Sequence, residues 1–249
     1  MAAVSVAGVA IAGGGGNTPV TVRAGNLELT FNGGFSPKAL SKKTLTPITL
    51  TAEGQIKTVD GTHPPALKEF ILETDKNGAV NTKGYPTCKS SKLQARDTNA
   101  ALKVCKSALI GEGKTNIEVA FPESKPIPVN SKLLVFNGGT AGGTTTLYIH
   151  AYITVPTPAA VVTTVKIKKI HNGRYGLKSV ATIPKIAGGS GSVTSFELKI
   201  HKTYTYKGKK VSVLSAKCTD GKLQAQGTAK FADGTTAEAE IIRTCTPKG

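Results

Sequence analysis

The chain has 249 residues, of which 39% are apolar and 5% aromatic, and it contains no tryptophan. This length is enough for one large β-domain or two smaller ones, and the apolar fraction supports a packed core. Frequent threonine, with 28 glycines and 13 prolines, favours short strands joined by tight turns over long helices.

The net charge of +17 is concentrated in the C-terminal part of the chain. Residues 160–249 hold 16 basic and 5 acidic side chains, and residues 1–159 hold 16 basic and 10 acidic ones. Such a surplus favours contact with nucleic acid, anionic cell-wall polymer or acidic glycan. The alternative is that the lysines keep solvated strand faces soluble.

Residues 2–12 form an uncharged run of small and apolar side chains. The run is too short for a spanning helix, which needs about 20 apolar residues, but it fits the apolar region of a signal peptide. Ala10-Ile11-Ala12 fits the cleavage site, so we expect residues 1–16 to be a signal-peptide remnant with a Gly-rich linker. Because no basic residue precedes Arg23, the alternatives are a start that lacks the basic leader or a buried strand.

Ten segments have the residue alternation and flanking turns of short strands. They are residues 26–31, 45–56, 67–74, 117–121, 132–136, 144–155, 161–170, 177–183, 193–202 and 211–217. Asp233-Gly234 predicts a hairpin turn, and residues 204–210 resemble another hairpin tip. Such strands indicate a sandwich or a barrel, and we expect an all-β antiparallel sandwich of two related units.

One short helix is expected near residues 98–108, with Asp97 or Thr98 as its N-cap. The Pro-rich stretch at residues 155–159 is the best boundary between the two halves. We therefore expect an N-terminal β unit over residues 17–155 and a basic C-terminal β unit over residues 160–249.

An internal repeat supports these two units. The string Cys-x-x-x-Lys-Leu-Gln-Ala occurs at residues 88–95 and again at 218–225. Each copy follows a strand pattern that contains phenylalanine and precedes a second cysteine. The agreement suggests that the halves arose by duplication.

The four cysteines are Cys88, Cys105, Cys218 and Cys245. None forms a Cys-x-x-Cys pair, which disfavours a zinc ribbon or a thioredoxin-like motif. An even count in an exported chain indicates disulfides, and the alternative is four buried thiols in a cytosolic protein. Three pairings are possible, of which the local one closes one loop in each half and could stabilise each half by roughly 3 kcal/mol.

No catalytic motif stands out. Gly113-Lys114-Thr115 resembles the end of a phosphate-binding loop, but Ala108 occupies the position where that loop needs glycine. The four histidines are dispersed, and His150, in the middle of a strand, is expected to be packed. We therefore expect a non-catalytic protein without metal or cofactor. The alternatives are a secreted hydrolase whose site is assembled from dispersed residues, and a structural subunit that pairs strands with its neighbours.

A basic cluster is the one positive indication of function. Lys166, Lys168, Lys169 and Arg174 flank one turn, and Lys202, Tyr204, Tyr206, Lys207, Lys209 and Lys210 flank another. Aromatic side chains between lysines can grip sugars or stack on bases, although lysines also protect strand edges from aggregation. Because lysine lacks the bidentate fork of arginine, we expect loose contact with a polyanion.

Five segments, at residues 92–95, 99–113, 134–138, 204–210 and 215–218, resemble a group of uncharacterised secreted β-rich proteins of actinobacteria. The resemblance extends over most of the chain from about residue 25. It implies export and a β-rich fold, and it implies no activity.

The sequence thus predicts a non-catalytic protein that is extracellular or at the cell surface, without a transmembrane segment. Its expected partner is an anionic cell-wall polymer or glycan, bound through the basic C-terminal half. Nucleic acid is the expected partner only if the protein is not exported.

Overall fold

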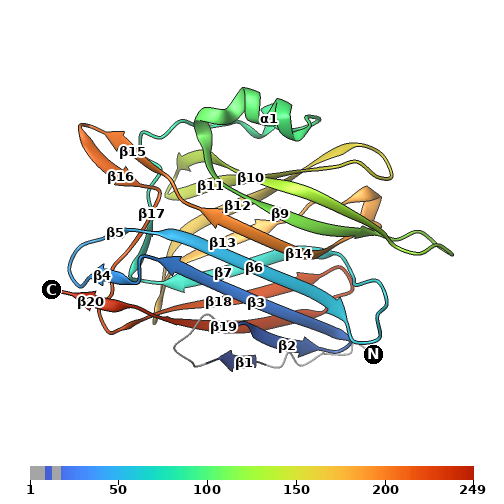
Figure 1. Ribbon diagram of the computed structural model, residues 1–249, viewed down its shortest axis with the longest axis horizontal. Coiled ribbons are helices and arrows are strands. Elements are labelled where there is room, and N and C mark those ends of the chain that lie inside the picture. The colour runs from blue at the N-terminus through green and yellow to red at the C-terminus, as the bar shows by residue number, and fades with distance from the viewer. Residues whose placement is uncertain (1–8, 13–17) are drawn as a thin grey trace.

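The computed structural model describes residues 9–12 and 18–249 of the chain (Figure 1). The described part has one α-helix, α1 (Thr98–Cys105), and three turns of 3-10 helix, η1 (Ser90–Lys92), η2 (Lys106–Ala108) and η3 (Ala187–Gly189). Its strands are β1 (Val9–Ala12), β2 (Val20–Ala24), β3 (Leu27–Ser36), β4 (Ala39–Ser41), β5 (Thr46–Pro47), β6 (Thr49–Thr58), β7 (Leu67–Asp75), β8 (Gly78–Val80), β9 (Leu109–Val119), β10 (Ile127–Ala141), β11 (Thr144–Ile153), β12 (Ala159–Asn172), β13 (Tyr175–Thr182), β14 (Gly191–Ile200), β15 (Thr203–Tyr206), β16 (Lys209–Ser212), β17 (Leu214–Ala216), β18 (Lys222–Phe231), β19 (Thr236–Thr244) and β20 (Thr246–Lys248). The all-β prediction with one short helix is confirmed.

The main sheet is a nearly closed antiparallel barrel of twelve strands. Their order is β19-β18-β7-β13-β12-β11-β10-β9-β14-β6-β3-β2, and the two end strands, β2 and β19, lie side by side. Strand β1 pairs with β19 in parallel and also contacts β2, so it lies at this seam. The expected sandwich is wrong because the strands form one sheet that curves back on itself. Alternating apolar residues are required equally by both architectures.

The two predicted units do not fold side by side. Strand β7, from the first half, lies between β18 and β13 from the second half. Strand β14, from the second half, lies between β9 and β6 from the first. The Pro-rich stretch connects β11 to β12, which are adjacent in the sheet. Hydrogen bonds thus join both halves in one barrel.

The repeated string adopts two different structures. In the first copy, residues 92–95 end η1 and form a turn in which Ala95 has a φ of 55°. In the second copy, residues 222–225 begin the extended strand β18. The shared string therefore does not mark a repeated structural element. Of the predicted signal-peptide remnant, Val9–Ala12 forms β1, and residues 1–8 and 13–16 lie outside the described residues, so cleavage of a leader stays a prediction.

Helix α1 lies on the outside of the barrel (Figure 1). The side chain of Asp97 accepts a hydrogen bond of 2.8 Å from the backbone N–H of Ala100, as predicted for an N-cap. Ala101 and Cys105 of the helix pack with Leu134 and Phe136, the outward-facing residues of β10. The disulfide between Cys88 and Cys105 fixes both ends of this segment.

Three small sheets complete the fold. Strands β5, β17 and β8 form a three-stranded sheet, and β15 pairs with β16 in the predicted hairpin. Strand β20 pairs with β4 in parallel. The second disulfide, between Cys218 and Cys245, links the segment after β17 to the end of the chain, so the structure forms the local pairing. Figure 1 shows β5 and β17 at one end of the barrel strands.

Candidate functional site: an apolar cavity inside the barrel

Every second side chain of a barrel strand points into the barrel. Side chains from β3, β6, β7, β9 to β14, β18 and β19 surround a cavity of about 320 Å³. Most of its lining residues are aliphatic or aromatic, and the charged ones are Glu53, Asp75 and Arg243. The cavity therefore lies inside the sheet, and nearly every strand of the barrel contributes to its wall.

The partial burial of several inward-facing residues also indicates the cavity. Leu72, Leu177, Ala181, Leu198 and Ala225 face inward and line the cavity, yet each is only half-buried. Interior side chains of proteins normally pack as densely as organic crystals and leave no such surface. Their accessible surface faces the cavity, because their strand neighbours on either side point out of the barrel.

A small lid sheet covers one end of this cavity. Strands β5, β17 and β8 bring Val80, Leu214 and Ala216 to the lining. Two residues after β17, Cys218 packs with Cys245, Phe35, Leu40 and Leu223 in a buried cluster. The Cys218–Cys245 disulfide therefore anchors the lid sheet to the end of the barrel.

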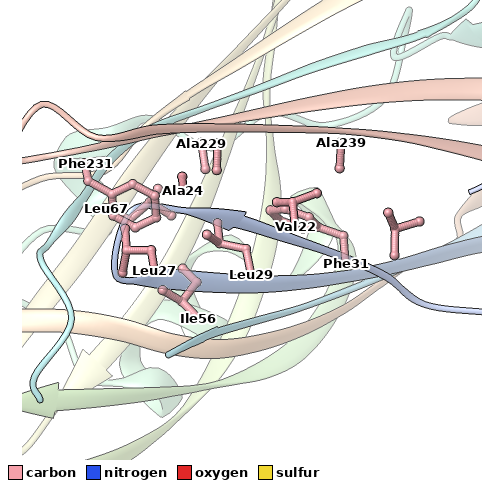
Figure 2. Close-up of a cluster of buried hydrophobic side chains, with 12 residues drawn as sticks. Val22, Ala24, Leu27, Leu29, Phe31, Ile56, Leu67, Ala229, Phe231 and Ala239 are labelled. Carbon is pink, nitrogen blue, oxygen red and sulfur yellow. The ribbon is translucent and has the colours of Figure 1, made fainter. Parts of the chain in front are cut away.

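The opposite end of the barrel is filled. Figure 2 shows side chains of β2 and β3 pointing towards β18 and β19, where they form one buried cluster. Leu29 is completely buried there, and Phe31 and Phe231 are nearly so. A second cluster, around Ile117, Val119 and Ile153, fills the neighbouring part of the barrel. The cavity is thus confined to the half of the barrel below the lid sheet.

Three phenylalanines form the floor between the filled end and the cavity. The rings of Phe31 and Phe70 are 5.7 Å apart, and those of Phe70 and Phe196 are 6.4 Å apart. All three line the cavity. A Cβ atom on Gly54 would come within 2.3 Å of the Phe196 ring, so glycine at this position makes room for the floor.

Arg243 is the cationic side chain in the cavity wall. It lies near the end of β19 and is 5% exposed. Its guanidinium donates to the carbonyl oxygens of Gly33, Ile242 and Thr18 and to the amide oxygen of Asn32. Strand β2 begins at Val20, which pairs with Phe31, so Gly33 has no β2 partner and Arg243 bridges β19 and β3 at this point of the seam.

The predicted polyanion site is divided by the structure. Arg174 is engaged within the fold: it forms ion pairs with Asp75 and Asp220 and donates to the carbonyl oxygen of Lys222. The two carboxylates raise the pKa of Arg174, and the hydrogen bond from Arg174 lowers the pKa of Asp220 to about 2. This arginine holds together β7, β13 and the start of β18.

The two tyrosines of the basic hairpin face the protein. The hydroxyl of Tyr204 donates to the carbonyl oxygen of Lys83 at 2.9 Å, and its ring lies 4.9 Å from that of Tyr85. The ring of Tyr206 covers Gly84, where a Cβ atom would come within 2.1 Å. Both tyrosines fix the β15–β16 hairpin to residues 81–85.

The lysines of the predicted site are exposed. They are Lys166, Lys168, Lys169, Lys202, Lys207, Lys209 and Lys210. Within residues 9–12 and 18–249, none of them forms an ion pair with a carboxylate. Lys166 and Lys168 line a surface hollow of about 480 Å³ together with Thr87, Thr140, Thr144 and Thr146.

One group of side chains has the residue types of a hydrolase triad. The hydroxyl of Ser192 lies 3.1 Å from Nε2 of His63, and Nδ1 of His63 lies 3.5 Å from Glu118. However, Ser192 is only 2% exposed and its hydroxyl donates to the carbonyl oxygen of Pro64 at 2.6 Å. Because the Ser192 hydroxyl donates its proton to Pro64, in the loop before β7, the arrangement holds this loop against the barrel.

The other histidine of interest, His150, is packed as expected. It is completely buried, and its Nε2 lies 2.9 Å from the carbonyl oxygen of Arg96. Burial lowers its pKa. Across the described ranges, no cluster of three or more histidine, cysteine or acidic side chains is placed to hold a metal ion. The helices in the same ranges are too short and polar to cross a membrane.

Comparison with protein-family models, with curated proteins and with solved structures gave no match to this chain. The resemblance to secreted actinobacterial proteins remains a prediction.

The sequence interpretation missed the cavity and Arg243. One signal was present: Ala237, Ala239 and Ile241 alternate along the last barrel strand, and the next inward position is Arg243. A charged residue that continues an apolar face indicates a buried charge with a specific role.

Proposed function

We propose that this protein is a binding protein that holds a small apolar molecule inside its barrel. The observation that carries the proposal is the lidded cavity of about 320 Å³, lined by apolar side chains from nearly all barrel strands. Small-molecule sites have volumes of roughly 300–1,000 Å³ and are lined mainly by apolar groups. The cavity matches both properties.

The cost of an empty cavity supports an occupant. Each Å³ of apolar cavity destabilises a protein by about 24 cal/mol, so a void of this size would cost several kcal/mol. Typical domains are stable by only about 5–15 kcal/mol. A ligand in the cavity offsets that cost and, by mass action, stabilises the folded state.

The proposed working place is an oxidising compartment, such as the outside of the cell. Two disulfides support this location, because disulfides persist mainly in such compartments. We propose a non-catalytic role, since the buried hydroxyl of Ser192 donates to a carbonyl and its proton is unavailable for attack on a substrate.

The test is the binding of N-phenyl-1-naphthylamine, a neutral apolar dye whose fluorescence rises in an apolar site. We expect saturable binding to the wild-type protein and loss of it in Ser179→Phe, whose ring would occupy the cavity. The matched control is Val180→Phe on the outer face of the same strand, which should bind as the wild type does. Equal binding by both variants would exclude the cavity as the site.

A second candidate function is loose binding of an anionic cell-wall polymer or glycan. It is favoured by the surface hollow at Lys166 and Lys168, together with the exposed lysines of the β15–β16 hairpin. Residues 81–88 connect the two places, because Tyr204 bonds to Lys83 and Thr87 lines the hollow. An anionic chain could therefore contact both.

Polyphosphate serves as the probe for this second function. Replacing Lys207, Lys209 and Lys210 by alanine should weaken polyphosphate binding and reduce its dependence on salt. The control replaces Lys114, Lys132 and Lys230, which gives the same change in net charge elsewhere on the barrel. If the two triple variants lose affinity equally, only the overall charge matters and the hairpin is not a site.

A further inference from the structure

Arg243 places a positive charge in the cavity wall without a direct ion pair to any of the described residues. The residue is only 5% exposed. Across residues 9–12 and 18–249, none of the ion pairs involves Arg243. Burying a charge is costly unless an opposite charge or strong hydrogen bonds compensate it.

The hydrogen bonds of Arg243 bring no negative charge to its guanidinium group. All four go to neutral acceptors: the carbonyl oxygens of Gly33, Ile242 and Thr18 and the amide oxygen of Asn32. They account for Nε and Nη2 and for one N–H of Nη1, so the second N–H of Nη1 remains for another acceptor. Burial lowers the pKa of Arg243, but an arginine side chain stays protonated in proteins.

A second cation lies at the same end of the cavity. The ammonium group of Lys38 is 4.2 Å from the centre of the Phe35 ring, and Phe35 lines the cavity. Burial and the charge of Arg243 both lower the pKa of Lys38. Like charges repel, so their proximity makes this end of the cavity favourable for an anion.

The wall beside Arg243 leaves space for a head group. Gly33 and Gly34 line the cavity there and carry no side chains. A Cβ atom on Gly33 would meet only the carbonyl oxygen of Thr51, at 3.5 Å. Two acidic residues also line the cavity, but Asp75 is paired with Arg174, and Glu53 accepts a hydrogen bond from the side-chain amide of Asn32. The cavity thus combines an apolar body, floored by the three phenylalanines, with an end at which Arg243 has no direct ion pair within the described part of the chain.

We infer that the occupant of the cavity is an amphipathic monocarboxylate, whose apolar part fills the barrel and whose carboxylate binds the guanidinium of Arg243. This inference rests on the proposed function and specifies its ligand. A carboxylate supplies the missing negative charge and accepts the remaining N–H of Nη1. Charge-assisted hydrogen bonds of this kind are among the strongest in proteins.

The seam contact gives Arg243 a structural role as well. By donating to the carbonyl oxygens of Gly33 and Thr18, it joins β19 to β3 and to the residues just before β2 begins. A loss of ligand binding in an Arg243 variant could then reflect an open seam. The experiment must therefore measure the preference between a charged and a neutral ligand, because a damaged barrel weakens both.

The probes are decanoate and 1-decanol, which share an alkyl chain and differ in the head group. Each is titrated by displacement of N-phenyl-1-naphthylamine at pH 7. We expect the wild-type protein to bind decanoate at least about tenfold more tightly than the alcohol. Arg243→Gln should abolish this preference, and Arg243→Lys should keep part of it. The control Arg23→Gln, which removes an exposed arginine outside the cavity, should leave the preference unchanged.

Acidification tests the inference on the wild-type protein alone, should Arg243→Gln fail to fold. The preference for decanoate should disappear as the pH falls below the pKa of the decanoate carboxyl group, because the ligand becomes neutral while Arg243 stays charged. Equal binding of both probes at pH 7 would overturn the inference and leave the cavity proposal intact. If neither probe nor the dye binds, the proposed function itself fails.

Discussion

The filled and hollow ends of the barrel are built from the same strands, yet only one of them packs. Strand β3 contributes Leu29 to the filled end and Phe35 to the cavity, and β18 contributes Ala229 to the filled end and Ala225 to the cavity. The difference has two sources. Strand β2 adds Val20, Val22 and Ala24 to the filled end, while the hollow end has the inward side chains of Ala52, Ser179, Ala181 and Ala225. Alternation of apolar and polar residues is enough to form the wall of a barrel, and the volume of the inward side chains decides whether its interior is filled.

Two leucines that face the barrel interior give the largest expected contrast. Leu29→Ala in the filled end should destabilise the protein by about 2–5 kcal/mol, because it opens a void in a packed cluster. Leu72→Ala should cost clearly less, since Leu72 already borders the cavity and is half-buried. Urea unfolding of both variants measures the difference. Equal losses would mean that the hollow end packs as tightly as the filled one.

Removing the two disulfides one at a time should affect stability similarly but ligand binding differently. Removing either pair, as Cys88→Ser with Cys105→Ser or as Cys218→Ser with Cys245→Ser, should cost about 3 kcal/mol, because each closes a loop of similar length. Dye binding should fall only in the second double variant, since that disulfide anchors the lid sheet.

Thermal unfolding and dye titration of both double variants test this expectation. The Cys88–Cys105 variant is the control, because this bond holds α1 on the outer face of β10. Loss of dye binding in that control, with the other variant unaffected, would contradict the assignment of the lid.

Two alanines on the same face of β18 should respond to the same change with opposite sign. Ala225→Leu fills part of the cavity and should stabilise the ligand-free protein by roughly 0.5–2 kcal/mol. Ala229→Leu overpacks the filled end, where Ala229 is 1% exposed, and should destabilise it by about 1–3 kcal/mol. Chemical denaturation without ligand measures both. Destabilisation by both variants would show that the space near Ala225 cannot accept a side chain.

The smallest expected effect is a pH dependence at the hollow end. Arg174 lowers the pKa of Asp220 to about 2, below its value of about 4 in an unfolded chain. The folded state therefore gains stability from ionised Asp220 above about pH 4, and this gain is lost as the pH falls towards 2. Because the Asp220 side chain is 40% exposed, solvent screening limits the gain to less than about 1 kcal/mol.

Urea unfolding at pH 5 and at pH 2.5 measures this contribution as a difference between the wild type and Asp220→Asn. The gap between the two proteins should narrow on acidification. A gap that is constant across this range would show that the ion pair adds nothing to stability.

Much of the local structure could be predicted from the sequence. The N-cap at Asp97 and the turn at Asp233-Gly234 depend on neighbouring residues alone, and both occur as expected. The first and last residues of the strands were harder to predict from the sequence. Strand β3 continues through Gly33-Gly34 to Ser36, and β9 begins at Leu109 although glycines disfavour a strand there. Gly111 and Gly113 are needed because the backbone of β14 would come within 2.6 Å and 1.8 Å of a Cβ atom at these positions.

The strand order and the candidate site depend on contacts between distant residues. Nothing near Leu67–Asp75 indicates that this strand lies between β13 and β18, because any strand with an apolar face could pair there. Half-buried and fully buried inward residues also look alike in a sequence. The cavity was therefore hidden in the same alternation that predicted the strands. Only the small residues on its wall and the isolated Arg243 distinguish it.

The seam has a consequence for how the protein is made. The barrel closes where β2, at residues 20–24, meets β19, at residues 236–244. Because β19 is the last of the twelve barrel strands in chain order, the growing chain holds an open sheet with two unpaired edges until β19 has been made. Chains that stop early expose those edges to one another, and they would aggregate by strand pairing. Pairing of β19 therefore closes the barrel and also removes the free strand edges through which nascent chains could associate.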